Sequence, residues 1–242
     1  MLNDNSNSNI NNNENIKEKI ESAYRTLGSN SFYDEMMTHS SFLGSAVNYL
    51  VWGYTKSDSD LINGRVLSYI GENFEGKLLD VPVGTGVLTI PFYSLITKAD
   101  INCLDYSEEM LNQAKEKAEK LKLKNIKFQQ GDVGNLPYED NSFDIVLLMN
   151  GFHAFPDKEK AFKETYRVLK EDGKFCGCFY IQGQSWKTDF IVNNIYVKKG
   201  YFTPPFETIE TFKEKMTKMY KEVEIDNVKS LVSFNCVKKK YF

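Results

Sequence analysis

The stretch Leu78-Leu79-Asp80-Val81-Pro82-Val83-Gly84-Thr85-Gly86 decides the fold of this chain. A short apolar run ends in a carboxylate, and a glycine-rich turn and a helix-period apolar pattern over residues 87–95 follow at once. This order predicts a buried strand, a tight turn and a helix. Gly84 and Gly86 let the backbone approach a ligand closely, and the amides that open a helix donate hydrogen bonds. The junction is typical of nucleotide binding, although a glycine pair alone also occurs at ordinary turns of α/β sheets.

Two further predicted strands also end in carboxylates. Asp105 closes the second strand, and the third strand, over residues 126–130, runs into Gly131-Asp132. Asp105 stands about where an open α/β nucleotide fold places the acid that binds ribose hydroxyls. Together with Asp80, these acids predict a ligand site at one edge of a parallel sheet.

The combined motifs resemble a known family. Asp80-x-Pro-x-Gly84-x-Gly86, Asp105-Tyr-Ser-Glu-Glu-Met110-Leu, Gly131-Asp132 and the Ser-Phe-Asp-Ile-Val strand at 142–146 resemble class I S-adenosylmethionine (SAM) methyltransferases, in particular the quinone-biosynthesis-like, methyltransferase-domain-11-like branch that acts on small molecules. The resemblance covers roughly residues 78–179. It implies an α/β, Rossmann-like fold, with helices on both faces of a seven-stranded, mostly parallel sheet whose last strand is inserted antiparallel.

The resemblance also implies roles for individual residues. Asp105 would bind the ribose hydroxyls, Asp132 the adenine amino group, and Val133 and Met110 the two faces of the adenine ring. The loop from Asp80 to Gly86 would hold the methionine end of the cofactor. The complete set of predicted cofactor contacts is Asp80, Val81, Pro82, Gly84, Gly86, Asp105, Tyr106, Met110, Asp132, Val133 and Asn150.

Pro82 departs from the family pattern, which usually has glycine at this place. Proline fixes φ and has no amide hydrogen to donate. Two interpretations remain open: a loop built around a fixed φ, or a loop whose SAM binding is impaired.

The chain divides into three parts by composition and periodicity. Residues 1–15 are rich in asparagine and predict a disordered tail. Residues 16–56 predict a helical N-terminal lid, and residues 57–242 a SAM-binding core with a lid insertion at about 183–219. Tyr33 in the first lid and Trp186 in the second are the predicted substrate contacts, because aromatic walls suit an apolar or planar acceptor and exclude water.

His153 follows the predicted strand at 143–148, where open α/β sheets bind ligands. Histidine titrates near neutral pH, so His153 is a candidate general base or orienting group. The four cysteines fall in predicted strands and are expected to be reduced core residues. Cys176 and Cys178 share a strand face, but no other ligand has suitable spacing, so we expect no metal site.

The 242 residues carry a formal net charge of −3, with an isoelectric point near 5.6. This balance provides no basic field for nucleic acid. No apolar run has the length of a membrane span and no signal-peptide pattern opens the sequence. We expect a cytoplasmic protein, a monomer or homodimer, with a small-molecule acceptor as partner.

The predicted function is methyl transfer from SAM to a small, partly apolar acceptor, with release of S-adenosylhomocysteine (SAH). A nicotinamide-dependent oxidoreductase shares the glycine turn and the ribose acid. However, Thr89 stands where the dinucleotide fingerprint has glycine or alanine, and Gly131-Asp132 has no role in that scheme. A non-catalytic SAM-binding regulatory protein is the other alternative, which Pro82 keeps open.

Overall fold

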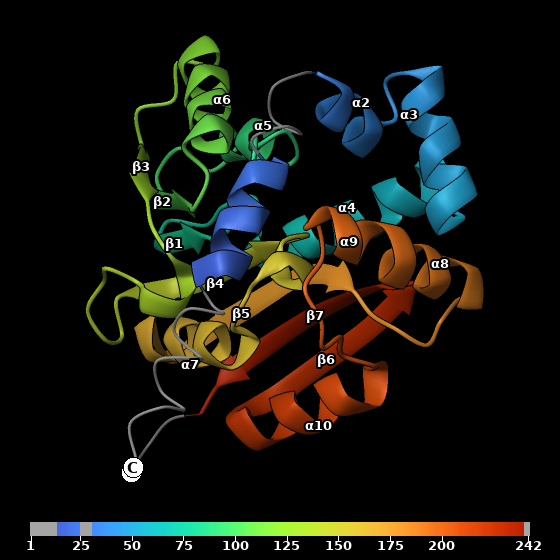
Figure 1. Ribbon diagram of the computed structural model, residues 1–242. Helices are drawn as coiled ribbons and strands as arrows, with labels where there is room; N and C mark the ends of the chain where they lie inside the picture. Colours follow the sequence, from blue (N-terminus) through green and yellow to red (C-terminus); the bar gives the residue numbers. More distant parts are fainter. Residues whose placement is uncertain (1–13, 25–30, 240–242) are drawn as a thin grey trace.

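A seven-stranded sheet forms the centre of the molecule (Figure 1) in a computed structural model that describes residues 14–24 and 31–239. The strand order is β3-β2-β1-β4-β5-β7-β6, and neighbouring strands from β3 to β5 pair in parallel. β7 lies between β5 and β6 and is antiparallel to both. This arrangement confirms the predicted fold class, including the position of the last strand. The strands are β1 Lys77–Asp80, β2 Asp100–Asp105, β3 Ile126–Gln130, β4 Phe143–Met149, β5 Leu169–Tyr180, β6 Tyr220–Val228 and β7 Leu231–Lys238.

Helices cover both faces of the sheet. Helices α4 (Lys56–Ile70), α5 (Thr89–Tyr93) and α6 (Glu108–Lys120) pack on one face, and α7 (Lys158–Val168) and α10 (Ile209–Met219) on the other. α6 illustrates the cause. The Ser107 side chain caps its first turn, and apolar residues at helical spacing face the sheet while lysines and glutamates face solvent. The helix predicted over residues 87–95 is only the five residues of α5.

The two faces have different cores. The side of α4, α5 and α6 is mainly aliphatic. The side of α7 and α10 is rich in phenylalanine, with Phe152, Phe162, Phe175, Phe179, Phe212 and Phe234 among its buried residues. Each cysteine lies buried and unpaired in a strand, as predicted: Cys103 in β2, Cys176 and Cys178 in β5, and Cys236 in β7.

Additional helices lie at the carboxyl edge of the parallel strands. Residues 14–24 form one helix. It is followed by α2 (Phe32–Thr38), α3 (Phe42–Val47) and the π-helix η1 (Asn48–Trp52). A later segment of the chain adds α8 (Trp186–Ile191), η4 (Val192–Tyr196) and α9 (Val197–Lys199) next to them (Figure 1). The two groups meet where the Thr188 hydroxyl donates to the Val51 carbonyl at 3.0 Å.

Two predicted boundaries need correction. Residues 1–13 of the predicted tail lie outside the described residues, but residues 14 and 15 belong to a helix. The lid insertion predicted at about 183–219 is too long, since α10 packs on the sheet. Phe212 and Met216 of α10 are fully buried in the phenylalanine-rich core, so α10 is part of the core.

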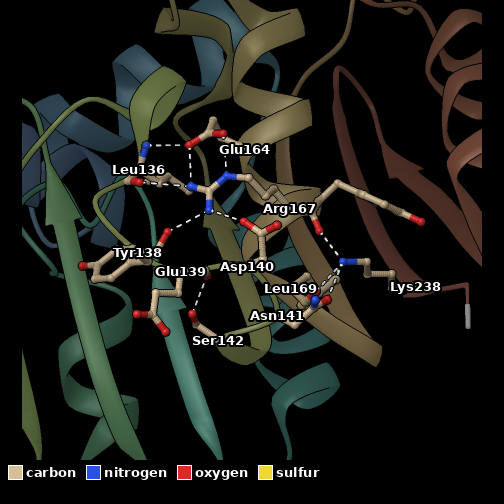
Figure 2. A network of polar contacts seen from close by, with 11 residues as sticks. Leu136, Tyr138, Glu139, Asp140, Asn141, Ser142, Glu164, Arg167, Leu169 and Lys238 are labelled. Atoms are coloured by element: carbon tan, nitrogen blue, oxygen red, sulfur yellow. Dashed lines mark hydrogen bonds and ion pairs between the residues drawn. The ribbon is translucent and has the colours of Figure 1, made fainter. Parts of the chain in front are cut away.

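A network centred on Arg167 fixes the loop between β3 and β4 (Figure 2). The guanidinium binds both carboxylate oxygens of Glu164 at 2.8 Å and also donates to the carbonyl groups of Leu136 and Tyr138. Glu164 in turn accepts the Leu136 amide at 2.8 Å. The short 3₁₀ helix η2 (Val133–Asn135) directly precedes Leu136. The network therefore holds the segment that follows Asp132 against α7.

Within the described ranges, no helix is both long and apolar enough to cross a membrane. The same part of the chain contains no group of three or more His, Cys, Asp or Glu side chains placed to hold a metal ion.

Candidate functional site

A cavity opens at the carboxyl ends of β1 to β4, which we call the strand-end cavity. The strand order reverses between β1 and β4, and open α/β sheets bind ligands at this switch point. Ten of the predicted cofactor contacts line it: Val81, Pro82, Gly84, Gly86, Asp105, Tyr106, Met110, Asp132, Val133 and Asn150. The helix of residues 14–24 and α2 close it from above with Lys17, Ile20, Glu21, Tyr24, Tyr33 and Met37.

The glycine loop adopts a backbone that requires glycine. Gly84 and Gly86 have φ values of 57° and 66°, in the left-handed region that glycine adopts without steric cost. A Cβ on Gly86 would lie 2.4 Å from Cγ1 of Ile90, the side chain that anchors α5. The space beside Gly84 is empty within 4 Å. The loop thus leaves room for a ligand on one side and packs closely against α5 on the other.

Asp105 connects this loop to the end of β2. Its Oδ2 accepts the Gly84 amide at 2.7 Å and its Oδ1 accepts the Ser107 amide at 2.9 Å. Burial raises the pKa of the Asp105 carboxyl to about 6, although these amide hydrogen bonds favour the charged form. A carboxylate can accept about four hydrogen bonds, so Asp105 can also accept one from a ligand hydroxyl.

Asp132 lies at the other end of the strand-end cavity. Its Oδ1 accepts the Gly134 amide at 2.8 Å, and its Oδ2 lies 2.5 Å from Nζ of Lys17. The hydrogen bond to Asp132 raises the pKa of the Lys17 ammonium. This contact, which the sequence did not reveal, holds the helix of residues 14–24 over the cavity. No local signal could have found it, since the two residues are 115 positions apart.

Asp80 does not line the cavity, in contrast to the sequence-based expectation. It is fully buried below the glycine loop, and its Oδ2 accepts the Tyr93 hydroxyl at 2.7 Å. Its Oδ1 has no hydrogen-bond partner among residues 14–24 and 31–239. Burial raises the pKa of Asp80 to about 7. Asp80 thus links the end of β1 to α5 through Tyr93.

Pro82 packs against the segment that follows β4. A Cβ on Gly151 would lie 2.0 Å from Cγ of Pro82, so the proline ring fills the space that a side chain at position 151 would need. The φ of Gly151 is −120°, which any residue can adopt. Gly151 is therefore required by the proline ring and not by its own backbone. Pro82, which stands where the family usually has glycine, therefore packs against Gly151.

A second cavity of about 390 Å³ adjoins the first, and we call it the aromatic cavity. Of the residues that the structure describes, four line both cavities: Tyr24, Tyr33, Met37 and Asn150. Asn150 directly follows β4 with a φ of 61°, and its side-chain amide faces Sδ of Met37 at 3.8 Å. A non-glycine residue with positive φ at the end of a central strand is uncommon and often functional. The passage between the cavities thus runs between Asn150 and the N-terminal helices.

α2 is attached to the glycine loop by one carboxylate. Asp34 Oδ1 accepts the Thr85 hydroxyl at 2.5 Å, and Asp34 Oδ2 pairs with Nζ of Lys117 in α6 at 2.8 Å. Both charged side chains are mostly shielded from solvent, which strengthens the pair. The adjacent Tyr33 reaches both cavities, as its predicted role requires, so Asp34 fixes the position of Tyr33.

Trp52 is the tryptophan of the aromatic cavity. Its ring lies 5.7–6.3 Å from the rings of Tyr54, Tyr180, Tyr196 and Phe202. Trp186, the residue predicted from the sequence, is instead 83% exposed and lines neither cavity. Trp186 opens α8, and the face of α8 that turns inward carries Thr188, which is bonded to Val51. Trp186 therefore lies outside both cavities, whereas Trp52 lines the aromatic cavity.

His153 lines the aromatic cavity in an uncharged form. Its ring stacks on Phe202 with centroids 3.9 Å apart, and its carbonyl accepts the Thr203 amide at 2.9 Å. Burial lowers the pKa of His153 to about 3, and the positive charge of Lys158 contributes to the shift. Nδ1 of the ring is buried and has no hydrogen-bond partner in the part of the chain that the structure describes. A neutral imidazole can orient a ligand through a hydrogen bond but is a weak base at neutral pH.

The residues of the strand-end cavity fit SAM. Its charged lining residues in the described chain are the acids Glu21, Asp105 and Asp132 together with Lys17. This excess of negative charge suits a ligand with a sulfonium and an ammonium group. Val133, Met110 and Leu104 supply apolar surface between Asp105 and Asp132, which suits the flat adenine ring.

Fold and site together define a class I SAM-dependent methyltransferase. The model of a family described as "Methyltransferase domain" matches residues 73–230. The match covers more than half of the chain, so the chain belongs to this family. Membership decides against the nicotinamide-dependent oxidoreductase.

Relatives and solved structures agree with this membership. A demethylmenaquinone methyltransferase of Staphylococcus epidermidis is 40% identical over 110 residues, which are 45% of this chain and 45% of that protein. A demethylmenaquinone methyltransferase of Lactobacillus johnsonii is 43% identical over 98 residues, or 40% of each chain. The alignments span less than half the length of these relatives.

Two solved structures share the fold at low sequence identity. A protein from Haloferax volcanii, solved with the Trm112 methyltransferase activator, has a TM-score of 0.68 and 14% identity. The similarity covers 92% of this chain and 99% of that chain. A SAM-dependent methyltransferase from Thermotoga maritima has a TM-score of 0.59 and 21% identity, covering 84% of this chain and 100% of that one.

Proposed function

We propose that the protein transfers a methyl group from SAM to a small, planar, partly apolar acceptor bound in the aromatic cavity, and releases SAH. The observation that carries this proposal is the contact between the two cavities. A ligand in the strand-end cavity and one in the aromatic cavity would meet at Tyr24, Tyr33, Met37 and Asn150. Methyl transfer needs this geometry, because the acceptor must approach the methyl carbon from the side opposite to sulfur.

In the proposed complex the residues of the strand-end cavity bind and orient the cofactor. Asp105 accepts the ribose hydroxyls through the lone pairs that the Gly84 and Ser107 amides leave unused. The Asp132 carboxylate accepts a hydrogen bond from the adenine amino group and another from Lys17, whose contact keeps the N-terminal helix closed. Bound SAM supplies a methyl group on a sulfonium that carries its own leaving group.

The chain contributes alignment and exclusion of water. An electron pair of the acceptor forms the new bond to the methyl carbon, the carbon–sulfur bond breaks, and its electron pair stays on sulfur. The proton of a hydroxyl acceptor passes to water at the cavity mouth. Because the pKa of His153 is lowered to about 3, we assign His153 the role of a hydrogen-bonding, orienting residue rather than a general base.

The two lids would form the walls of the acceptor site. We propose that residues 16–56 and 183–206 act as one cover, joined by the Thr188–Val51 hydrogen bond, over a core formed by the rest of residues 57–242. The relatives named demethylmenaquinone methyltransferases support a planar, quinone-like acceptor, as do the aromatic walls around Trp52.

Calorimetry with SAM, SAH and NAD tests the cofactor assignment. We expect binding of SAM and SAH and none of NAD. Asp105→Ala should weaken SAH binding by about 1.5–3 kcal/mol, the value of a hydrogen bond to a charged group. Asp100→Ala removes a carboxylate from the opposite end of β2 and is the matched control. Tight NAD binding, or equal affinities of the two variants for SAH, would contradict the assignment.

A second assay separates a methyltransferase from a regulatory SAM-binding protein. The protein is incubated with SAM labelled in the methyl group and with a small-molecule extract of its own cells. Label should appear in a small aromatic product. Binding of SAH without transfer of label to any product would favour the regulatory alternative.

A further inference from the structure

We propose that the acceptor carries a negative charge on an aromatic ring system, and that Lys199 at the rim of the aromatic cavity selects it over aromatic amines. The inference rests on the proposed function and extends it to the charge of the substrate. It follows from the difference in charge between the two cavities.

The charged groups of the two cavities contrast sharply. The strand-end cavity is lined by three carboxylates and one lysine. The aromatic cavity has no carboxylate among its described lining residues, and its one ionised side chain there is Lys199. His153 is neutral because its pKa is lowered to about 3. Among the described lining residues a cationic acceptor would therefore find no partner of opposite charge, whereas an anionic acceptor would find Lys199.

Lys199 is available for this role. It is the last residue of α9, and Gly200, with a φ of 82°, ends the helix directly after it. Its side chain is exposed, and its ammonium makes no ion pair or hydrogen bond with residues 14–24 or 31–239. The neighbouring Lys198 is equally exposed but does not line the cavity. The two lysines differ in position relative to the cavity and not in charge.

The cofactor adds to the same preference. The sulfonium of the proposed cofactor is a cation, and it would face the acceptor across the passage at Tyr33 and Asn150. Like charges at short range in a water-poor cavity repel, and opposite charges attract. An ammonium on the acceptor would be repelled from both sides, by Lys199 and by the sulfonium, while a carboxylate would be attracted to both.

Deep in the cavity, the polar groups suit a hydroxyl on the acceptor ring. His153 lines the cavity, and its ring stacks on Phe202 with centroids 3.9 Å apart. A neutral imidazole has one donor and one acceptor nitrogen, so its ring can hydrogen-bond a hydroxyl on the acceptor. The structure thus favours a hydroxyaryl anion, with its hydroxyl near His153 and its charged group toward Lys199.

Aromatic walls also attract cations through the faces of their rings, so the opposite preference is a real competitor and defines the test. The two probes are 4-hydroxyphenylacetate and tyramine, which share a phenol ring and carry opposite charges. The chain has two tryptophans. In a Trp186→Phe background, Trp52 is the sole reporter, and its fluorescence responds to ligands in the aromatic cavity. Titrations are made with saturating SAH, which lacks the sulfonium charge, so they isolate the effect of Lys199. The binding of SAH itself is measured by calorimetry.

We expect 4-hydroxyphenylacetate to bind about tenfold more tightly than tyramine. Lys199→Glu should reverse the order of the two probes, and Lys198→Glu, with the same change in net charge, should leave it unchanged. Tighter binding of tyramine, equal effects of the two glutamate variants, or no response of Trp52 to either probe would overturn the inference. If SAH binds in these experiments, the proposed function survives such a result. If SAH does not bind, the proposed function itself fails.

Discussion

Replacing Asp80 by asparagine should change how the stability of the protein depends on pH. Asp80 is fully buried and bonded to Tyr93, and burial raises the pKa of its carboxyl to about 7. Asparagine has nearly the same shape, keeps an oxygen that can accept the Tyr93 hydroxyl, and cannot ionise. The variant therefore removes the titration of one buried group while it preserves the packing below the glycine loop.

The sign follows from proton binding in the two states. Between pH 4 and 7 the unfolded chain has lost the proton of Asp80, with its ordinary pKa of 3.8, while the folded protein retains it. The contribution of Asp80 to stability is complete below pH 3.8 and is lost as pH rises to about 7. Each unit of pKa difference between the folded and unfolded states corresponds to about 1.4 kcal/mol. The shift from 3.8 to about 7 therefore lowers the free energy of unfolding by at most about 4 kcal/mol.

Urea unfolding of the wild-type protein and Asp80→Asn at several pH values from 4 to 8 measures this loss. The difference in unfolding free energy, variant minus wild type, should increase by up to about 4 kcal/mol between pH 4 and 7. Above pH 7 this difference should stay constant. Asp100→Asn, at the exposed end of β2, is the control. Parallel pH profiles of wild type and Asp80→Asn would refute the reasoning.

Three other substitutions test contacts around the site. Gly151→Ala should destabilise the protein by about 1–3 kcal/mol in urea unfolding, because the new methyl group overlaps with the Pro82 ring. The double variant with Pro82→Gly should recover most of this stability. Additive effects of the two substitutions would contradict the proposed contact. Asp34→Asn removes the ion pair with Lys117 and should speed hydrogen exchange of the α2 amides while exchange in the sheet is unchanged; uniform acceleration would mean general destabilisation. Arg167→Lys keeps the charge but loses the paired hydrogen bonds to Glu164 shown in Figure 2. The substitution should lower the free energy of unfolding by about 1–2 kcal/mol. An unchanged urea midpoint would be inconsistent with this network.

Features encoded by short stretches of sequence were predictable. The strand ends at Asp80 and Asp105 and the glycine turn each follow from local patterns of apolar, acidic and turn residues. Their relative position also follows, because parallel strands bring their carboxyl ends to one edge of the sheet. For this reason ten of the predicted cofactor contacts line one cavity.

Features that depend on packing between distant segments were not predictable. Trp52 and Trp186 both stand in aromatic segments, and their sequences do not indicate which ring turns inward. That choice depends on α8 meeting η1 through Thr188. The contact of Lys17 with Asp132 likewise joins segments far apart in the chain. Asp80 was misplaced because a strand-end acid can point into the cavity or, as here, remain beneath the loop beside Tyr93.

The contact between Pro82 and Gly151 has a consequence for how such sequences can diverge. With glycine at position 151, either glycine or proline fits at position 82. Once proline occupies position 82, its ring takes the space of any side chain at 151, so only glycine fits there. The order of substitutions is therefore constrained: glycine at 151 has to be present when proline arises, and afterwards the two positions can change only in the reverse order. Relatives with proline at position 82 should carry glycine at position 151. Relatives with glycine at position 82 can carry residues other than glycine at position 151.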